Sequence, residues 1–285
     1  MSQPLLITVN GTGCPGPFDP GFSGDIGRAF AYDPWQALAA NRSGVKYGTP
    51  LYWQPVGYPA AVLPMGKSVE AGRAEVNRLL AMHERSGLCP PGWPFYLSGY
   101  SQGAIVTGEV LAKDILDPAG AHHGRLKDCR GVINFGDPLR CPGLARGNEI
   151  AKLPAPKELD KQTTGGIAGP ACLTAEQSEL VYSCALDGDL YACAPVGADP
   201  WHHEPEVGKV ETRIYQFIQN GSLVKGLWYI AEGIAEECEM PVSHTIAHMQ
   251  AIINGLKFAA AGTAAPHWQY GPFVAPLIEW VRQQI

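Results

Sequence analysis

The sequence predicts an α/β protein built in three layers, with a parallel sheet between two layers of helices. Short apolar stretches alternate with amphipathic ones along the amino-terminal half, and βα units produce this order. The stretch "RGVINFGDPLR" is apolar almost without interruption, as expected of a parallel strand buried on both faces. A chain of 285 residues with 46% hydrophobic content can bury the core that such a sheet needs.

Each element can be located from its composition and from the turn residues that flank it. Strands are expected in "LLITVNGTG", "VKYGTPLYWQPV", "PFYLSGYS", "RGVINFGDPLR" and "LVYS". Helices are expected over residues 33–42, 68–87 and 101–116, and again in "FVAPLIEWVRQQI" at the carboxyl end. Ser68 is the expected N-cap of the second helix, and Gly87 ends it. A parallel sheet collects its ligands at the carboxyl ends of its strands.

The pattern changes near residue 205, where two helical stretches follow each other without a strand between them. They are "GSLVKGLWYIAEGIAEECEM" and "HTIAHMQAIINGLKFAAAG", and the first carries a stripe of apolar residues. Packing on a core is the simpler interpretation, and a lid or acyl-chain platform over a nearby site is the functional one. We therefore expect a core over residues 1–204, a helical insertion over 205–262, and a return to the core over 263–285.

Charge and composition argue against two classes of partner. The net charge is −6 and no run of Lys or Arg occurs, whereas nucleic-acid binding needs a concentrated basic surface. The start "MSQPLLITVNGTG" lacks the features of a secretory signal, and no run approaches the roughly 20 apolar residues of a membrane span. We expect a protein made in a cytoplasm, with no nucleic-acid partner and no insertion into a membrane.

The eight cysteines are many for such a protein, but their spacing does not indicate a metal site. No C-x-x-C pair or other zinc-type spacing occurs among them. Neither a metal nor another cofactor is expected.

A candidate nucleophile stands where the third strand meets a helix. Gly99-Tyr100-Ser101-Gln102-Gly103 fits G-x-S-x-G, the pattern that places a serine on a strained turn in α/β-hydrolases. The flanking glycines let strand and helix approach without a collision of side chains. Because the match falls at a strand-to-helix junction, we interpret Ser101 as a nucleophile rather than a turn serine.

An activated serine needs a histidine to accept its proton and a carboxylate to orient that histidine. In this fold the acid follows the serine along the chain and the histidine comes last. Asp187 and Asp189 follow "LVYS", and Gly188 permits a sharp turn that favours Asp189. A solvated turn is the alternative for either aspartate.

His267 is the candidate base, because it stands on a Pro- and Gly-bounded loop just before the last helix. The other seven histidines suit other roles. Three are expected at the surface (His83, His122 and His123), two follow the acid too closely to form a separate loop (His202 and His203), and two share a helical face at a spacing that fits packing better than zinc (His244 and His248).

The site also needs two donors for the negative oxygen that develops on the substrate carbonyl, each worth about 3 kcal/mol. One is the backbone N–H of Gln102, which lies at the helix start and lacks an intrahelical acceptor. The second is expected from the loop after the first strand, where "VNGTG" offers the N–H of Thr12. An ordinary glycine turn is the competing interpretation of that loop.

The ordered set "VNGTG", "GYSQGA", "INFGDPLR", "GIAGP" and "GDLYA" resembles the mycobacteriophage lysin B esterases, relatives of the cutinases. The resemblance spans most of the α/β region, and its specificity lies in the order of the motifs. It implies a cutinase-like α/β-hydrolase with a helical insertion near the active site. It also assigns the nucleophile to Ser101, the acid to Asp189 rather than Asp187, and the base to His267. By analogy with cutinases, it implies a Cys184–Cys193 disulfide that ties the loop carrying Asp189.

The resemblance further implies a function. The family cleaves the ester that joins mycolic acids to arabinogalactan, which separates the mycobacterial outer membrane from the wall during phage release. The expected partner is thus a lipid ester of the mycobacterial envelope, attacked after release from the host cytoplasm. One alternative is a virion-associated, cutinase-like lipolytic esterase, which the cysteine count would suit. Another is a non-catalytic hydrolase scaffold that serves a virion as a structural or receptor-binding component.

Overall fold

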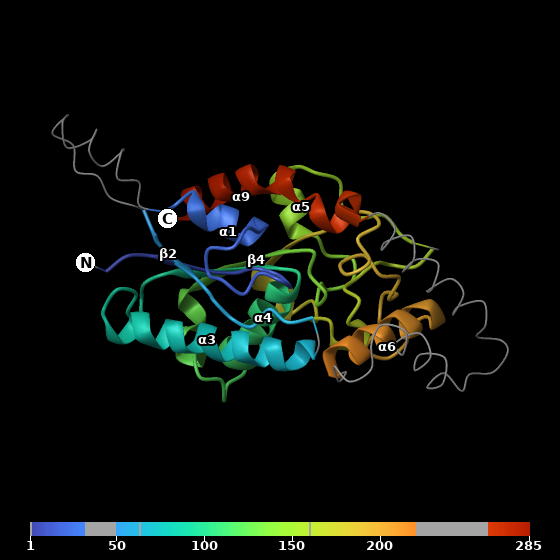
Figure 1. Ribbon diagram of the computed structural model, residues 1–285, viewed down its shortest axis with the longest axis horizontal. Helices are drawn as coiled ribbons and strands as arrows, with labels where there is room; N and C mark the ends of the chain where they lie inside the picture. The colour runs from blue at the N-terminus through green and yellow to red at the C-terminus, as the bar shows by residue number, and fades with distance from the viewer. Residues whose placement is uncertain (1, 32–49, 63, 160, 221–261) are drawn as a thin grey trace.

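A five-stranded parallel sheet forms the centre of the molecule (Figure 1). The computed structural model describes residues 2–31, 50–62, 64–159, 161–220 and 262–285. The strands are β1 (Leu5–Val9), β2 (Tyr52–Pro55), β3 (Phe95–Tyr100), β4 (Cys129–Phe135) and β5 (Val181–Cys184). They lie in the order β2-β1-β3-β4-β5, and each neighbouring pair is parallel. All five carboxyl ends therefore meet at one edge of the sheet.

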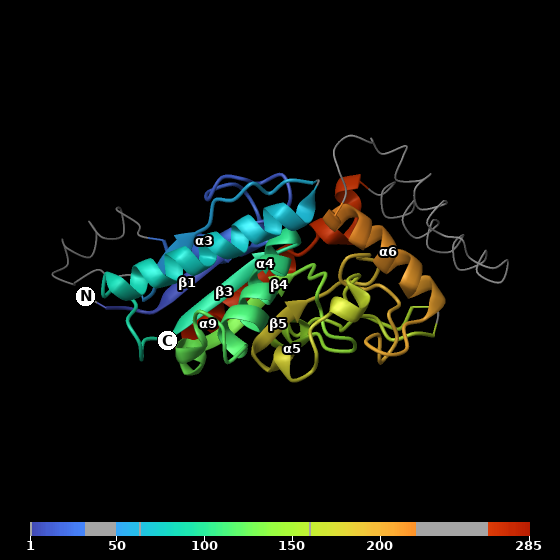
Figure 2. The same ribbon diagram turned by 90° about the horizontal axis from the view of Figure 1, so that it is seen from below.

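Helices cover both faces of the sheet (Figures 1 and 2). One layer consists of α1 (Phe22–Arg28), α5 (Arg146–Ala151) and α9 (Gly271–Gln284). The other contains α3 (Met65–Arg85) and α4 (Gln102–Val110), with α6 (Glu206–Asn220) packed beside α3. A π-helical segment (η1, Leu111–Leu116) continues α4, and short 3₁₀ helices occur at His123–Asp128 (η2), Gly169–Ala171 (η3), Gln177–Leu180 (η4), Gly262–Ala264 (η6) and Pro266–Trp268 (η7). The predicted three-layer α/β architecture is confirmed.

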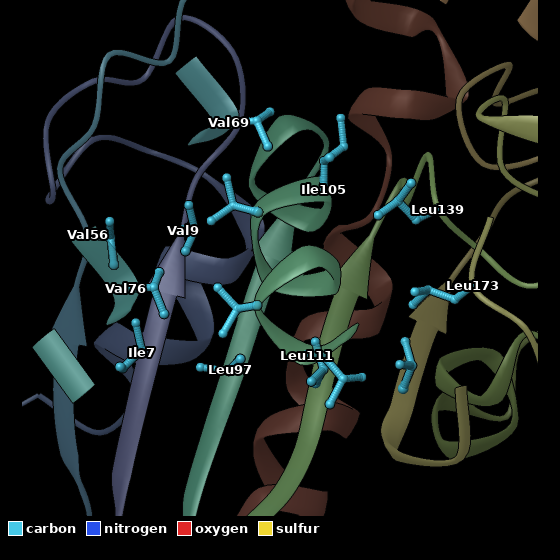
Figure 3. Packing of buried hydrophobic residues seen from close by; sticks show 14 of the residues in the cluster. Ile7, Val9, Val56, Val69, Val76, Leu97, Ile105, Leu111, Leu139 and Leu173 are labelled. Atoms are coloured by element: carbon cyan, nitrogen blue, oxygen red, sulfur yellow. The ribbon is translucent and has the colours of Figure 1, made fainter. Parts of the chain in front are cut away.

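Each face of the sheet has its own hydrophobic core, because successive side chains of a strand point to opposite faces. Ile7, Val9 and Leu97 belong to the cluster shared with α3 and α4, and Figure 3 shows their packing. Leu6, Tyr96 and Ile133 belong to the cluster shared with α1 and α9. This double burial explains why the central strands are apolar at nearly every position.

The predicted strands and the helices that can be compared are present, with small differences at their ends. The helix expected from Ser68 begins at Met65 instead, so Ser68 is not its N-cap. Ser68 is buried within the first turns, and its Oγ accepts a hydrogen bond from the Ala61 N–H at 3.0 Å. The helix expected over 33–42 lies outside the described residues.

Most of the expected helical insertion, residues 221–261, also lies outside the described residues. The described part of the expected insertion contains α6. The boundaries at 204 and 262 remain predictions. No helix in the described ranges is long and apolar enough to cross a membrane.

Two histidines expected at the surface are buried. His83 is 5% exposed, and its Nε2 lies 2.9 Å from Gln54 Oε1, while His122 is 7% exposed. Burial lowers the pKa of both imidazoles. The prediction was wrong because loop position and a polar neighbourhood in the sequence do not reveal which segments pack over a histidine.

Candidate active site

The serine turn joins β3 to α4 and holds Ser101 in a backbone conformation that side chains rarely adopt. Its φ is 56° and its ψ is −117°. A non-glycine residue at positive φ carries a conformational cost, and such strain marks functional turns in hydrolases. Ser101 stands directly before the first residue of α4, at the carboxyl edge of the sheet.

The two glycines of the turn are required by close backbone contacts. A Cβ added at Gly103 would lie 2.1 Å from the carbonyl oxygen of Val9, and one at Gly99 would lie 2.4 Å from the carbonyl oxygen of Gly103. Real Cβ atoms do not approach other atoms so closely. The G-x-S-x-G spacing therefore lets α4 begin against β1 and β3.

The structure brings the three predicted side chains together. Ser101 Oγ lies 2.9 Å from His267 Nε2, and His267 Nδ1 lies 2.9 Å from Asp189 Oδ2 and 3.1 Å from its Oδ1. Because a carboxylate can only accept, Asp189 fixes the proton on Nδ1, and Nε2 is the nitrogen that accepts from the serine. The arrangement can move a proton from the serine hydroxyl to the imidazole.

Asp189 is completely buried and is held by more than the histidine. Its Oδ2 accepts a hydrogen bond of 2.6 Å from the Tyr270 hydroxyl, and its Oδ1 accepts one of 3.0 Å from the Tyr191 N–H. Burial, followed by the charge of Asp189, raises the pKa of Tyr270 well above its usual range, so the hydroxyl stays protonated and keeps donating. Asp187, the alternative acid, is exposed and instead accepts from the Lys157 N–H at 2.7 Å.

His267 lies in η7 and is oriented by aromatic neighbours. The Tyr100 hydroxyl donates to the His267 carbonyl oxygen at 2.9 Å, and the Tyr100 ring stacks on the imidazole with centroids 5.2 Å apart. The Tyr191 ring lies 4.8 Å from the imidazole centroid on a tilted plane. The sequence analysis did not identify Tyr100, Tyr191 and Tyr270 as part of the site. The signal that could have indicated them is that each lies within three positions of a predicted site residue.

The two expected oxyanion donors lie beside the serine. Thr12, Ser101 and Gln102 line one small cavity at the carboxyl edge of the sheet. The Gln102 side chain is fixed away from this role, since its Nε2 donates to the Ala61 carbonyl oxygen at 2.8 Å. As the first residue of α4, Gln102 has a backbone N–H without an intrahelical acceptor.

Of the alternative histidines, the structure describes His202, which lies outside this site. His202 is exposed, and its Nδ1 lies 2.9 Å from Asp199 Oδ1 on the same turn. His244 and His248 lie outside the described residues. Among the residues that the structure places, no group of three or more His, Cys, Asp or Glu side chains could hold a metal ion.

The Cys184–Cys193 disulfide implied by the resemblance is absent, and both residues are free thiols. Cys184 ends β5 and packs in the core between the sheet and α9, whereas Cys193 lies in a separate small cluster with Ala185 and Ala192. The Cys193 Sγ donates to the Leu186 carbonyl oxygen at 3.1 Å. The loop carrying Asp189 is therefore held by hydrogen bonds, including one of 2.5 Å from the Nε of buried Arg140 to the Ala192 carbonyl oxygen.

Gly136 follows β4 and is a further position where only glycine fits. A Cβ there would lie 2.7 Å from His267 Cε1 and 3.1 Å from Asp189 Oδ2, and its φ is +54°. We expect Gly136→Ala to lower kcat by about 10²-fold, since displacing the imidazole by about 1 Å has an effect of that size. The measurement is hydrolysis of nitrophenyl butyrate, with thermal unfolding followed in parallel.

Gly143→Ala is the matched control, because Gly143 also has a positive φ of 74° but a Cβ there would meet only Thr163 Cγ2, at 3.6 Å. It carries the backbone cost without the contact with the imidazole. Equal losses of kcat in the two variants would contradict the interpretation.

The parallel sheet, the strained serine turn and the hydrogen-bonded Ser–His–Asp arrangement define a serine hydrolase of the α/β-hydrolase fold. No family model matches the chain. Endolysin B of Mycobacterium phage L5 and that of Mycobacterium phage D29 are each 35% identical to it, over 99% of this chain and 100% of the relative. The crystal structure of lysin B from mycobacteriophage D29 is similar over 99% of this chain and 100% of that chain, with 32% identity and a TM-score of 0.66. The chain belongs to the endolysin B family.

Proposed function

We propose that this protein is a serine esterase that hydrolyses the ester between mycolic acids and arabinogalactan in the mycobacterial wall. Ser101 is the nucleophile, His267 the general base and acid, and Asp189 the group that orients the imidazole. The backbone N–H groups of Thr12 and Gln102 form the oxyanion hole. The observation that carries the proposal is the 2.9 Å separation between Ser101 Oγ and His267 Nε2, with Asp189 buried behind the ring.

The first half of the reaction forms an acyl-enzyme. His267 Nε2 accepts the proton as Ser101 Oγ attacks the ester carbonyl, and the resulting oxyanion accepts hydrogen bonds from the two amides. His267 then gives its proton to the oxygen of the departing alcohol, and the carbon–oxygen bond of the ester breaks. Asp189 stabilises the imidazolium, because its fully buried carboxylate lies against Nδ1, where water screens the attraction little.

The second half returns the enzyme to its starting state. Water enters where the alcohol left, gives a proton to His267 Nε2 and attacks the acyl carbon. The second oxyanion rests on the same two amides, and collapse of this intermediate breaks the bond to Ser101 Oγ, which takes back the proton. The products are a carboxylic acid and an alcohol.

Two observations support a lipid ester from a mycobacterial wall as the substrate. The relatives at 35% identity are endolysins of Mycobacterium phages, which supports a mycobacterial wall as the source of the substrate. The cavity beside Ser101 is walled by apolar side chains, which favour an acyl group over a charged one: Met65, Ile105, Pro138, Ile167, Tyr191 and Tyr215.

The test is release of free mycolic acids from purified mycolyl-arabinogalactan-peptidoglycan. The wild-type protein is expected to release them and Ser101→Ala is not. Hydrolysis of a nitrophenyl ester without any release from the wall complex would instead support a general cutinase-like esterase. Activity on neither substrate by folded protein would favour the non-catalytic scaffold.

A further inference from the structure

A second, larger cavity begins one helical turn beyond the serine. It has a volume of about 670 Å³ and lies between α3, α4 and α6. It shares Ile105 and Tyr215 with the small cavity at Ser101, so the two are neighbours along α4. Sites for small organic ligands commonly have volumes of roughly 300–1,000 Å³, so this cavity is large enough to bind a substantial part of a substrate. We call it the α4 cleft.

The lining of the α4 cleft is mixed, with apolar side chains beside polar ones. Six of its lining side chains come from α3, α4 with η1, the loops that follow β4 and η3, and α6: Val69, Ile105, Ala112, Leu139, Leu173 and Tyr215. Five of the six are nearly inaccessible to water, and Ala112 is half-buried. Figure 3 shows Val69, Ile105, Leu139 and Leu173 around α4. Where the exposed parts of these side chains reach the cleft, contact with hydrocarbon is favourable, because it removes apolar area from water.

The charged side chains around the α4 cleft are mostly occupied elsewhere. Arg73 makes a two-pronged ion pair with Asp114, at 2.7 and 2.8 Å. Lys113 pairs with Glu109 at 3.0 Å, and both lie on the solvent side of α4 and η1. These paired charges line the cleft together with further polar side chains, among them Glu70, Asp117 and Gln177.

The position of the α4 cleft relative to Ser101 indicates which half of the ester it would receive. His267 must protonate the departing alcohol, so the alcohol leaves on the imidazole side of the serine. The small cavity is lined by Thr12 and Gln102, the proposed oxyanion donors, and His267 is not part of its wall. A group that passes from the ester carbon along this wall into the cleft is therefore the acyl chain.

Resting on the proposed function, we infer that the α4 cleft binds the long acyl chain of the ester and gives the enzyme its preference for long-chain lipids. The chain would pass from Ser101 along Ile105 toward Ala112, about 16 Å at 1.5 Å per helical residue. Met65 and Gln219 border the route from the α3 and α6 sides, where Gln219 Nε2 contacts Met65 Sδ at 3.2 Å.

The test narrows the α4 cleft by substitutions on two of the elements that line it, η1 and η3. Ala112→Trp narrows it from η1, and Ala171→Trp narrows it from η3, where the alanine is exposed and its replacement leaves the core intact. Ala175→Trp is the matched control, since Ala175 is an exposed alanine of the same loop that does not line the cleft.

The readout is the ratio of kcat/KM for nitrophenyl palmitate to that for nitrophenyl butyrate. We expect Ala112→Trp and Ala171→Trp to lower this ratio at least about tenfold, since removing part of an apolar pocket has effects of this size. Ala175→Trp should leave both the ratio and the activity on nitrophenyl butyrate at the wild-type level. An unchanged ratio in both cleft variants would overturn the inference.

A binding measurement keeps the inference separate from the catalytic proposal. Ser101→Ala protein is titrated with cis-parinaric acid, a fluorescent fatty acid, with and without the cleft substitutions. Binding should be lost with Ala112→Trp and retained with Ala175→Trp, whether or not the wild type hydrolyses any ester. Wild-type inactivity on both nitrophenyl esters would count against the proposed function alone. Binding of delipidated arabinogalactan in place of the fatty acid, weakened by Ala112→Trp, would make the cleft a sugar site and overturn the inference.

Discussion

Replacing Ser101 with alanine is expected to lower kcat by about 10⁴- to 10⁶-fold on nitrophenyl butyrate, the range found when a triad nucleophile is removed. The loss follows from the 2.9 Å contact with His267 Nε2, because an alanine offers no oxygen to attack the ester. Stability should change little, since alanine adopts the positive-φ turn at a similar cost and no atom is added. The measurement is steady-state kinetics together with thermal unfolding.

Ser98→Ala is the control for this prediction. Ser98 precedes the turn in β3, is fully buried, and its Oγ has no hydrogen-bond partner within the part of the chain that the structure describes. A fluorophosphonate probe should label the wild type and Ser98→Ala but not Ser101→Ala. Labelling that survives in Ser101→Ala would place the activated serine elsewhere, and a folded wild type that is never labelled would favour the scaffold alternative.

The second large effect is expected for Asp189→Asn, with kcat reduced by about 10⁴-fold. An asparagine amide that turns its N–H₂ toward His267 Nδ1 favours the tautomer with the proton on Nε2, which cannot accept from Ser101. The side chain keeps its shape, so the hydrogen bond from Tyr270 can still be made to the amide oxygen. Steady-state kinetics on nitrophenyl butyrate measures the effect.

Asp187→Asn supplies a control that the sequence itself provides, two residues away on the same loop. Asp187 is exposed and accepts only the Lys157 N–H among the hydrogen bonds found in the described residues. The kcat of Asp187→Asn on nitrophenyl butyrate should remain near the wild-type value. A large loss in Asp187→Asn together with near-normal Asp189→Asn would exchange the roles of the two aspartates.

Much of this site could be predicted from the sequence, because its signals are local. G-x-S-x-G at a strand-to-helix junction marks Ser101, and the close contacts at Gly99 and Gly103 show why only that spacing permits the turn. The order of serine, acid and histidine narrowed the partners to a few residues. Gly188 between the two aspartates favoured Asp189, and the structure places Asp189 against the imidazole.

Other features depend on contacts between distant segments. Tyr270 touches Asp189 across 81 positions of sequence, and the Tyr100 hydroxyl reaches the His267 carbonyl across 167. The buried His83 contacts Gln54, which lies 29 positions away on another element. The Cys184–Cys193 disulfide that the family resemblance implies is absent, because the two cysteines pack into different clusters although only nine positions separate them.

The sequence by itself determined the parallel α/β fold, the strained serine turn and the small set of candidates for acid and base. These follow from hydrophobic periodicity and from backbone conformations that only certain residues permit, both of which act over a few positions. Only the tertiary structure decided which side chains surround Asp189 and His267, which thiols stay apart, and where the α4 cleft opens. Those outcomes depend on how three layers pack, and packing is a property of elements that are far apart in the chain.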